Sequence, residues 1–312
     1  MNTLRQSFTK LAVLWALAIV FFGLTVTTEN FFSIMNLRNI LDQQAFILMI
    51  AGFATIVIIS GGFDVSLGAI YILSPIVALK VENSTGSILY MVIAGAAVGV
   101  AAGVVNGLII AYGKINSFIT TLATSFILFG LAYILSDGSI LTLSDIESRS
   151  FVTKKILGIT SATWMAFAIL IISWILLERT RFGRSIFAIG GNIEAARLSG
   201  IRVARLQIIA FTLGGLGAGL AGALNSIRTT SAQASDDFSV IFAVIAAIVV
   251  GGTSIAGGSG AIWRSVAGVF FIAILVNGFN LNGIDPVFQR IIQGLVILLA
   301  VGADSIRSTR RT

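Results

Sequence analysis

Long apolar runs follow one another along almost the whole chain, and they constrain its fold more than any other feature. Ten can be distinguished, at about residues 11–27, 45–60, 66–79, 87–112, 117–135, 162–177, 206–226, 238–250, 261–276 and 291–303. A helix that crosses a bilayer needs about 20 apolar residues. With 57% hydrophobic residues, a soluble fold could not bury all of these side chains. We therefore expect an all-α fold, a polytopic transmembrane helical bundle.

The ten runs differ in length, and this bears on the number of full spans. The runs at 66–79, 238–250 and 291–303 are short for a span, so we expect them to be tilted, broken or re-entrant, and we expect eight to ten spans. The first run follows a basic segment, as in a signal peptide, but no A-x-A-like cleavage site follows it, so we interpret it as a retained span. Residues 1–312 are then one transmembrane domain, with a loop at 178–205.

The charged residues indicate an orientation. The net charge is +7, which in a soluble protein would suggest nucleic acid, but here the basic residues lie mostly between apolar runs and no nucleic-acid partner is expected. A ten-span topology with an internal amino terminus puts thirteen of the twenty basic residues inside. This predicts that both termini and the 178–205 loop are cytoplasmic. Cysteine and histidine are absent, so we expect no Cys or His metal site and no resident cofactor.

Glycine residues at four-residue spacing indicate how the helices pack. Gly95, Gly99 and Gly103 form one such row, and Gly215 and Gly219 belong to another. Small residues four apart let two helix backbones approach closely, which is a main source of association in lipid. Both rows are predicted to lie at helix contacts.

Two glycine-rich segments interrupt the apolar runs in the two halves of the chain. The first glycine break, Ser60–Gly68, reads SGGFDVSLG, and the second glycine break, Gly251–Gly260, reads GGTSIAGGSG. Transporters are often built from repeated halves with interrupted helices near the transport path. The similarity of the two breaks is therefore consistent with an internal duplication.

Asp64 is the one acidic residue within the first glycine break. A carboxylate at membrane depth is costly and needs a polar partner or a cavity. Three roles remain open: contact with a solute or proton, capping of the helix that begins near Val65 or Ser66, or a position in an interfacial loop. An Asp directly before a helix commonly accepts backbone N–H groups, which favours the capping role.

The 178–205 loop contains the signals of a short helix. Asn192 is a good N-cap, Glu194 falls in the first turn, and Gly200 is a common helix terminator. Such a helix would form a compact knob for a soluble partner. The loop also carries Arg181, Arg184, Arg197, Arg202 and Arg205. Lipid headgroups and an acidic protein surface are both possible partners for these arginines.

Five segments of the chain resemble one known family in the same order. They read SGGFDVSLGAI, VNGLIIAYGKINSFITTLAT, RFGRSIFAIGGNIEAARLSGIRV, VIAAIVVGGTSIAGGSGAIW and NGFNLNGIDPVFQRIIQGLVILLAV. Together they are similar to the permease subunits of bacterial ABC importers of the ribose, xylose and arabinose class. The resemblance covers about residues 30–305.

The resemblance implies an assembly in the bacterial inner membrane. Its expected partners are a second permease subunit, identical or different, two cytoplasmic ABC ATPase subunits that bind ATP and Mg²⁺, and a periplasmic sugar-binding protein that delivers a monosaccharide. The chain itself would catalyse no reaction. The implied ATPase-coupling residues are Asn192, Glu194, Ala195, Ala196, Arg197 and Gly200. Candidate residues of the substrate path are Asp64, Asn106 and Asn277, although a buried Asn is more often a tie between helices.

Some positions depart from the family pattern. Ile241 and Ala243 occur where acidic residues are usual, Arg264 replaces a glycine, and Ser117 replaces a proline. These departures leave the solute and the choice between homodimer and heterodimer open. The alternative function is a proton-driven secondary transporter of a small polar solute, but that mechanism favours ionisable residues in several spans, and this chain offers little beyond Asp64.

Overall fold

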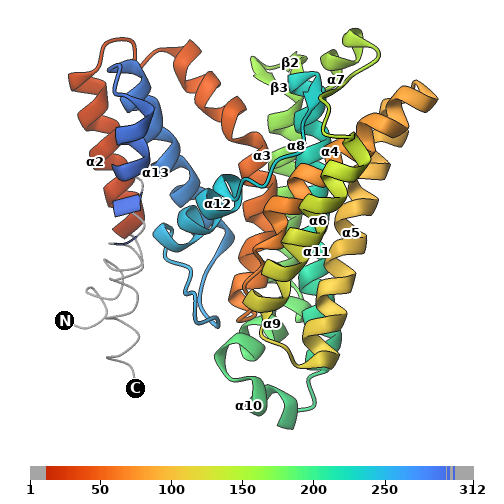
Figure 1. Ribbon diagram of the computed structural model, residues 1–312. Helices are drawn as coiled ribbons and strands as arrows, with labels where there is room; N and C mark the ends of the chain where they lie inside the picture. Colours follow the sequence, from red (N-terminus) through yellow and green to blue (C-terminus); the bar gives the residue numbers. More distant parts are fainter. Residues whose placement is uncertain (1–11, 293, 296–297, 299–312) are drawn as a thin grey trace, which may run out of the picture.

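The computed structural model describes residues 12–292, 294–295 and 298 of the chain, and in this part α-helices dominate (Figure 1). The principal helices are α2 (Ala12–Thr27), α3 (Ile34–Ile59), α4 (Ser66–Thr85), α5 (Ile88–Gly113), α6 (Ser117–Ser136), α8 (Ser161–Trp174), α11 (Val203–Thr229), α12 (Ser239–Val250) and α13 (Ile262–Leu281). The shorter ones are η1 (Ile146–Arg149), α7 (Ser150–Thr153), η2 (Ile175–Arg179), α9 (Arg181–Gly191) and α10 (Ile193–Leu198). Two-residue strands pair antiparallel, β1 (Leu141–Thr142) with β4 (Ser231–Ala232) and β2 (Lys155–Ile156) with β3 (Ile159–Thr160).

Two ends of the molecule can be named from these elements. The α10 end, at the bottom of Figure 1, contains α9 and α10, and the α7 end, at the top, contains α7, β2 and β3. Helices α3, α5 and α8 run toward the α10 end, whereas α4, α6 and α11 run toward the α7 end. The bundle is therefore built from alternating antiparallel helices.

Six helical segments in the described part of the chain are long and apolar enough to cross a membrane. They are Ile34–Ile59, Ile88–Gly113, Ser117–Ser136, Ser161–Arg179, Val203–Thr229 and Ile262–Leu281. The predicted all-α membrane bundle is confirmed, but the eight to ten spans are not. Helix α12 has 12 residues, or about 18 Å at 1.5 Å per residue, and falls short of the roughly 30 Å hydrocarbon core. The run predicted at 291–303 lies mostly outside the described residues.

Helices α5 and α11 pack along the two predicted rows of glycines. A Cβ atom on Gly99 would overlap the backbone of Gly215, and one on Gly95 would overlap Ala223 and approach the Gly219 carbonyl. The two backbones therefore touch directly, as the four-residue spacing predicts. Any side chain at the centre of this contact would force the helices apart.

Helix α4 lies at the centre of the bundle, against α5, α6 and α11. Ser74 donates its hydroxyl to the Gly219 carbonyl oxygen at 2.9 Å, which fixes α4 to α11. Pro75 lies inside α4 and removes the backbone donor that would otherwise bond the Tyr71 carbonyl. Gly222 of α11 packs against that carbonyl and the Pro75 ring, so the break in α4 is covered by a glycine.

Helices α2 and α13 lie side by side at the left of Figure 1. They are joined to the start of α3 by a small apolar cluster around Phe31, Ile40 and Ile274. Helix α12 connects this part to the rest, because it contacts α13, α3 and α4. Its Ile241 side chain packs on Gly68 at the start of α4.

Candidate coupling site

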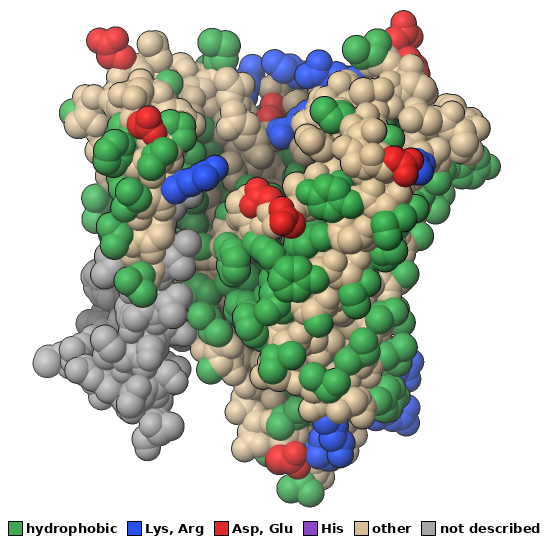
Figure 2. Space-filling view, viewed as in Figure 1, with side chains coloured by type: hydrophobic (Ala, Val, Ile, Leu, Met, Phe, Trp, Pro, Cys, Tyr) green, Lys and Arg blue, Asp and Glu red, His purple; other side chains and the backbone are tan. Residues whose placement is uncertain are grey.

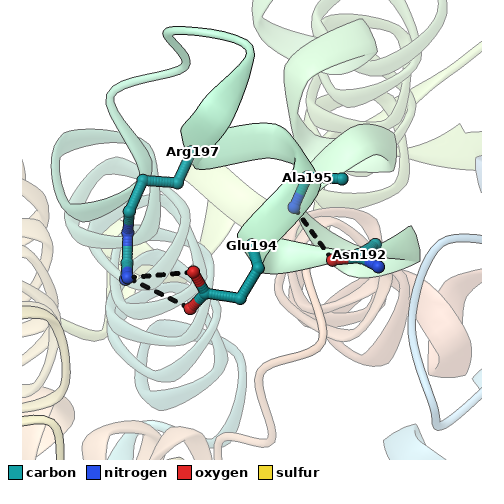
Figure 3. Close-up of polar contacts among 4 residues, drawn as sticks. All are labelled: Asn192, Glu194, Ala195 and Arg197. Carbon is teal, nitrogen blue, oxygen red and sulfur yellow. Dashed lines mark hydrogen bonds and ion pairs between the residues drawn. The ribbon is translucent and has the colours of Figure 1, made fainter.

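The short helix predicted in the 178–205 loop is α10, and it lies at the tip of the α10 end (Figure 1). The Asn192 side-chain oxygen accepts the Ala195 N–H at 2.9 Å and caps the first turn, as Figure 3 shows. Glu194 and Arg197 form an ion pair at 3.0 Å on the exposed side. The helix ends before Gly200, whose φ of +80° is in the left-handed region. The predicted local structure is confirmed at both ends of the helix.

The two faces of α10 differ in burial. Ala196 is buried in a small apolar cluster with Ile189 and Val203, which fixes α10 to α9 and α11. Leu198, by contrast, is 88% exposed. A single exposed apolar side chain is common on protein surfaces, so Leu198 marks the accessible face of α10 without by itself indicating a partner. Helix α10 is thus a firmly held knob with an apolar tip.

The carboxyl end of α9, which leads directly into α10, also contacts the two glycine breaks. A Cβ atom on Gly190 would overlap the Ile59 carbonyl and the Gly258 amide, so the three backbones touch. The Gly258 N–H donates to the Ile59 carbonyl oxygen at 2.8 Å, and Gly257 packs on Gly61. The first and second glycine breaks therefore meet each other beneath α9, and we call this contact the glycine junction.

The start of α9 is held equally closely to α8. The chain leaves α8 through η2, a single π-helical turn, and Thr180 then caps α9 by accepting the Gly183 N–H at 3.3 Å. A Cβ atom on Gly183 would overlap the Leu177 carbonyl. Helix α9 is therefore packed closely at both ends, against α8 at its start and against the glycine junction at its carboxyl end.

Asp64 caps α4, as its position before the helix predicts. Its Oδ1 atom accepts the Ser66 N–H at 2.9 Å and the Ser66 hydroxyl at 2.6 Å. Its Oδ2 atom is buried without a hydrogen-bond partner among the described residues. A cavity of about 10 Å³ adjoins Asp64, which is room for about one water molecule.

Asn106 ties three helices together. Its amide nitrogen donates to the Ser66 hydroxyl at 2.8 Å, and its carbonyl oxygen accepts the Thr124 hydroxyl at 2.7 Å. It is fully buried. Asp64, Ser66, Asn106 and the half-buried Thr124 thus form one chain of hydrogen bonds between α4, α5 and α6.

Asn277 belongs to a different contact. Its amide exchanges two hydrogen bonds of 2.9 Å with the amide of Asn36, which joins α13 to α3. The structure therefore brings Asp64 and Asn106 together but leaves Asn277 apart from them. Both asparagines already use their amides within the protein, which is the interhelical role that buried asparagine usually has.

The arginines near α10 line a groove. It has a volume of about 320 Å³ and lies between the end of α5, α10 and the start of α11. Arg197, Arg202 and Arg205 contribute to it, together with Tyr112. Lipid headgroups and an acidic protein surface both remain candidate partners for this groove.

Several polar contacts of the structure were not predicted from the sequence. The Ser117 hydroxyl accepts the Phe63 N–H at 3.0 Å and so fixes the first glycine break to α6. Tyr71 of α4 meets Asn225 and Arg228 near the carboxyl end of α11. The spacing of three between Asn225 and Arg228, at the end of an otherwise apolar helix, was the available signal, because residues three apart share a helix face.

Comparison with known proteins finds one matching family and several permease relatives. Residues 36–301 match the family described as branched-chain amino acid transport system / permease component. The ribose import permease protein of Escherichia coli (strain K12) is 37% identical over 96% of this chain and 97% of its own length. The L-arabinose transport system permease protein of the same strain is 38% identical over 92% and 88%. The galactose/methyl galactoside import permease protein of Salmonella typhimurium (strain LT2) is 33% identical over 99% and 96%. No solved structure matches the chain.

Proposed function

The chain belongs to this permease family and is the membrane-spanning subunit of an ABC importer in the inner membrane, and we propose that the solute it carries is a monosaccharide. The curated relatives at 33–38% identity are named for ribose, L-arabinose and galactose import. The family description names branched-chain amino acids, but the near full-length relatives support a sugar. A periplasmic binding protein would deliver it.

ATP hydrolysis belongs to a separate subunit in this class of importer. We place the docking site of that ATPase on α10. The residues concerned are Asn192, Glu194, Ala195, Ala196, Arg197 and Gly200. ATP and Mg²⁺ would be bound by the partner, and this chain would bind no cofactor of its own.

The glycine junction is the observation that carries the coupling proposal. Helix α10 is exposed and firmly fixed to α9, and Gly190 near the end of α9 touches Ile59 and Gly258. Closure of two ATPase subunits would move α10, and α9 would transmit that movement to both glycine breaks. Because packed backbones shift as units rather than deform, this movement can tilt the helices that begin and end there.

The proposal also gives the chain an orientation in the membrane and a partner permease subunit. The α10 end would be cytoplasmic, with both termini on that side, in keeping with thirteen of twenty basic residues on the inner side of a ten-span topology. Two permease chains, identical or different, would enclose the path, and eight to ten segments of each would lie in the membrane. A proton-driven secondary transporter is not favoured, because the relatives are importer permeases.

A reconstituted importer tests this function. The chain is placed in lipid vesicles with its ATPase and binding protein, and uptake of radiolabelled D-ribose, L-arabinose and D-galactose is measured with ATP or with a non-hydrolysable analogue. We expect ATP-dependent accumulation of at least one sugar. Uptake that follows an imposed proton gradient and ignores ATP would instead support the secondary transporter.

A further inference from the structure

The carboxyl end of α11 carries a buried acceptor that the protein itself does not use. The Asn225 Oδ1 atom is buried and has no hydrogen-bond partner among the described residues. The same side chain interacts with Tyr71 of α4. A buried carbonyl oxygen costs free energy unless some group supplies a donor. Asn225 thus differs from Asn106 and Asn277, whose amides are bonded within the protein.

Arg228 lies three residues further along α11 and has unused donors. Its guanidinium carbon is 4.7 Å from the centre of the Phe46 ring, within the range of a cation–π contact. In the part of the chain that the structure describes, the one ion pair joins Arg197 to Glu194, so no described carboxylate lies within 4.0 Å of Arg228. A planar guanidinium can give two parallel N–H bonds to neighbouring oxygen atoms.

Asp42 supplies a fixed acceptor close to this arginine. Its Oδ1 atom accepts the backbone N–H and hydroxyl of Thr160, at 3.0 and 2.8 Å, and the Thr163 hydroxyl at 2.6 Å. These bonds fix the carboxylate at the start of α8. It is near enough to interact electrostatically with Arg228, and its Oδ2 atom has no hydrogen bond to the described residues.

We propose that Tyr71, Asn225 and Arg228 form a binding site for adjacent hydroxyl groups of a neutral sugar. A hydroxyl group both donates and accepts, so it can satisfy Asn225 and Arg228 at once. A carboxylate could accept from Arg228 but would offer no donor to Asn225 and would meet Asp42. The Asn225 oxygen, the Arg228 guanidinium and the Tyr71 phenol together offer acceptors and donors, and this combination favours a neutral polyol.

The position of this site suits a solute that enters from the α7 end. Asn225 and Arg228 lie near the carboxyl end of α11, which runs toward that end of the bundle, and Tyr71 of α4 interacts with both of them. Figure 2 shows a hollow at the top of the molecule with charged side chains of both signs inside it. The inference rests on the proposed function, in which a binding protein releases sugar at this end, and it gives the sugar its first contact in the permease.

A labelling experiment tests the site directly. The chain has no cysteine, so Thr229→Cys introduces a single thiol at an exposed position one turn from Asn225. The full assembly in vesicles is treated with a water-soluble thiol reagent, with and without millimolar D-ribose, L-arabinose or D-galactose. We expect at least one sugar to slow labelling several-fold, whereas betaine at equal osmolarity has no effect. Labelling that no sugar slows would overturn the site.

Second substitutions assign the protection to these residues. Either Asn225→Leu or Arg228→Gln is added to the Thr229→Cys chain, and each is expected to abolish the protection by sugar. Asn225→Asp keeps the acceptor oxygen, so we expect it to retain part of that protection. Arg149→Gln is the matched control, because Arg149 is an exposed arginine that interacts electrostatically with Arg228. Protection that survives both Asn225→Leu and Arg228→Gln would place the sugar elsewhere and overturn the proposal. ATP-dependent uptake by the unaltered assembly is measured in parallel, so failure of the proposed function is seen separately from failure of this site.

Discussion

Replacing Gly190 by alanine adds one methyl group at the glycine junction. The new Cβ atom would overlap the Ile59 carbonyl and the Gly258 amide, and it would separate the pair that now forms a 2.8 Å hydrogen bond. Overpacking a close contact commonly costs about 1–3 kcal/mol, and a lost backbone hydrogen bond adds about 1 kcal/mol. We therefore expect the substitution to destabilise the junction by about 2–4 kcal/mol in total.

Gly191 provides a matched control one residue away. A Cβ atom on Gly191 meets nothing within 4 Å, so Gly191→Ala adds the same methyl group without a clash. Alanine is favoured over glycine in helices by up to about 1 kcal/mol, although the end of a helix gains less. We expect Gly191→Ala to be neutral or slightly stabilising.

The assay compares the two variants in the reconstituted importer. Sugar taken up per ATP hydrolysed reports coupling, and the thermal inactivation midpoint of the detergent-solubilised assembly reports stability. Gly190→Ala should lower both, while binding of the ATPase to the membrane stays normal because α10 is unchanged. Equal behaviour of the two variants would refute the role given to the glycine junction.

Three further predictions use the same assembly. Gly99→Leu should prevent α5 and α11 from packing and abolish stable expression, whereas Gly130→Leu, whose Cβ position is open, should express normally, as detergent gel filtration would show. Glu194→Lys removes the ion pair with Arg197, so it should uncouple sugar uptake from ATP hydrolysis and weaken co-purification of the ATPase while the chain stays in the membrane. Unchanged co-purification would contradict this prediction. Asp64→Asn keeps the side-chain oxygen that accepts the Ser66 N–H, and Asn and Asp are equally good caps, so we expect little change in stability and intact ATPase association. A variant that no longer binds the ATPase would argue against a purely local role.

Those parts of the structure that depend on local chemistry could be predicted from the sequence. Asn192 and Gly200 fix the two ends of α10 through a cap and a left-handed residue, and both signals are readable without tertiary information. The same holds for Gly99 and Gly215, because spacing alone indicates a close helix contact. The family was recognisable from the order of five segments.

Other features depend on which helices become neighbours. Asp64 and Asn106 are 42 positions apart in the sequence, and only the packing of α4 on α5 joins them through Ser66. Asn277 was grouped with them by residue type, but it pairs with Asn36 across a different contact. The contact between the two glycine breaks next to Gly190 could not be predicted either, because it depends on α9 packing against the end of α3. The span count differed because hydropathy does not separate a crossing helix from a short buried one such as α12.

The central claim is that α10 contacts the ATPase, and crosslinking from its tip tests this most directly. Leu198→Cys gives a single thiol at a position that is 88% exposed on α10, and Leu157→Cys gives one at a position that is 87% exposed at the α7 end. Each thiol is modified with a short photo-crosslinker in membranes that contain the complete importer, and the products are identified by mass spectrometry. We predict that Leu198→Cys is joined to a P-loop ATPase and that Leu157→Cys is not. An ATPase joined to position 157, or none joined to position 198 in membranes with active uptake, would contradict it.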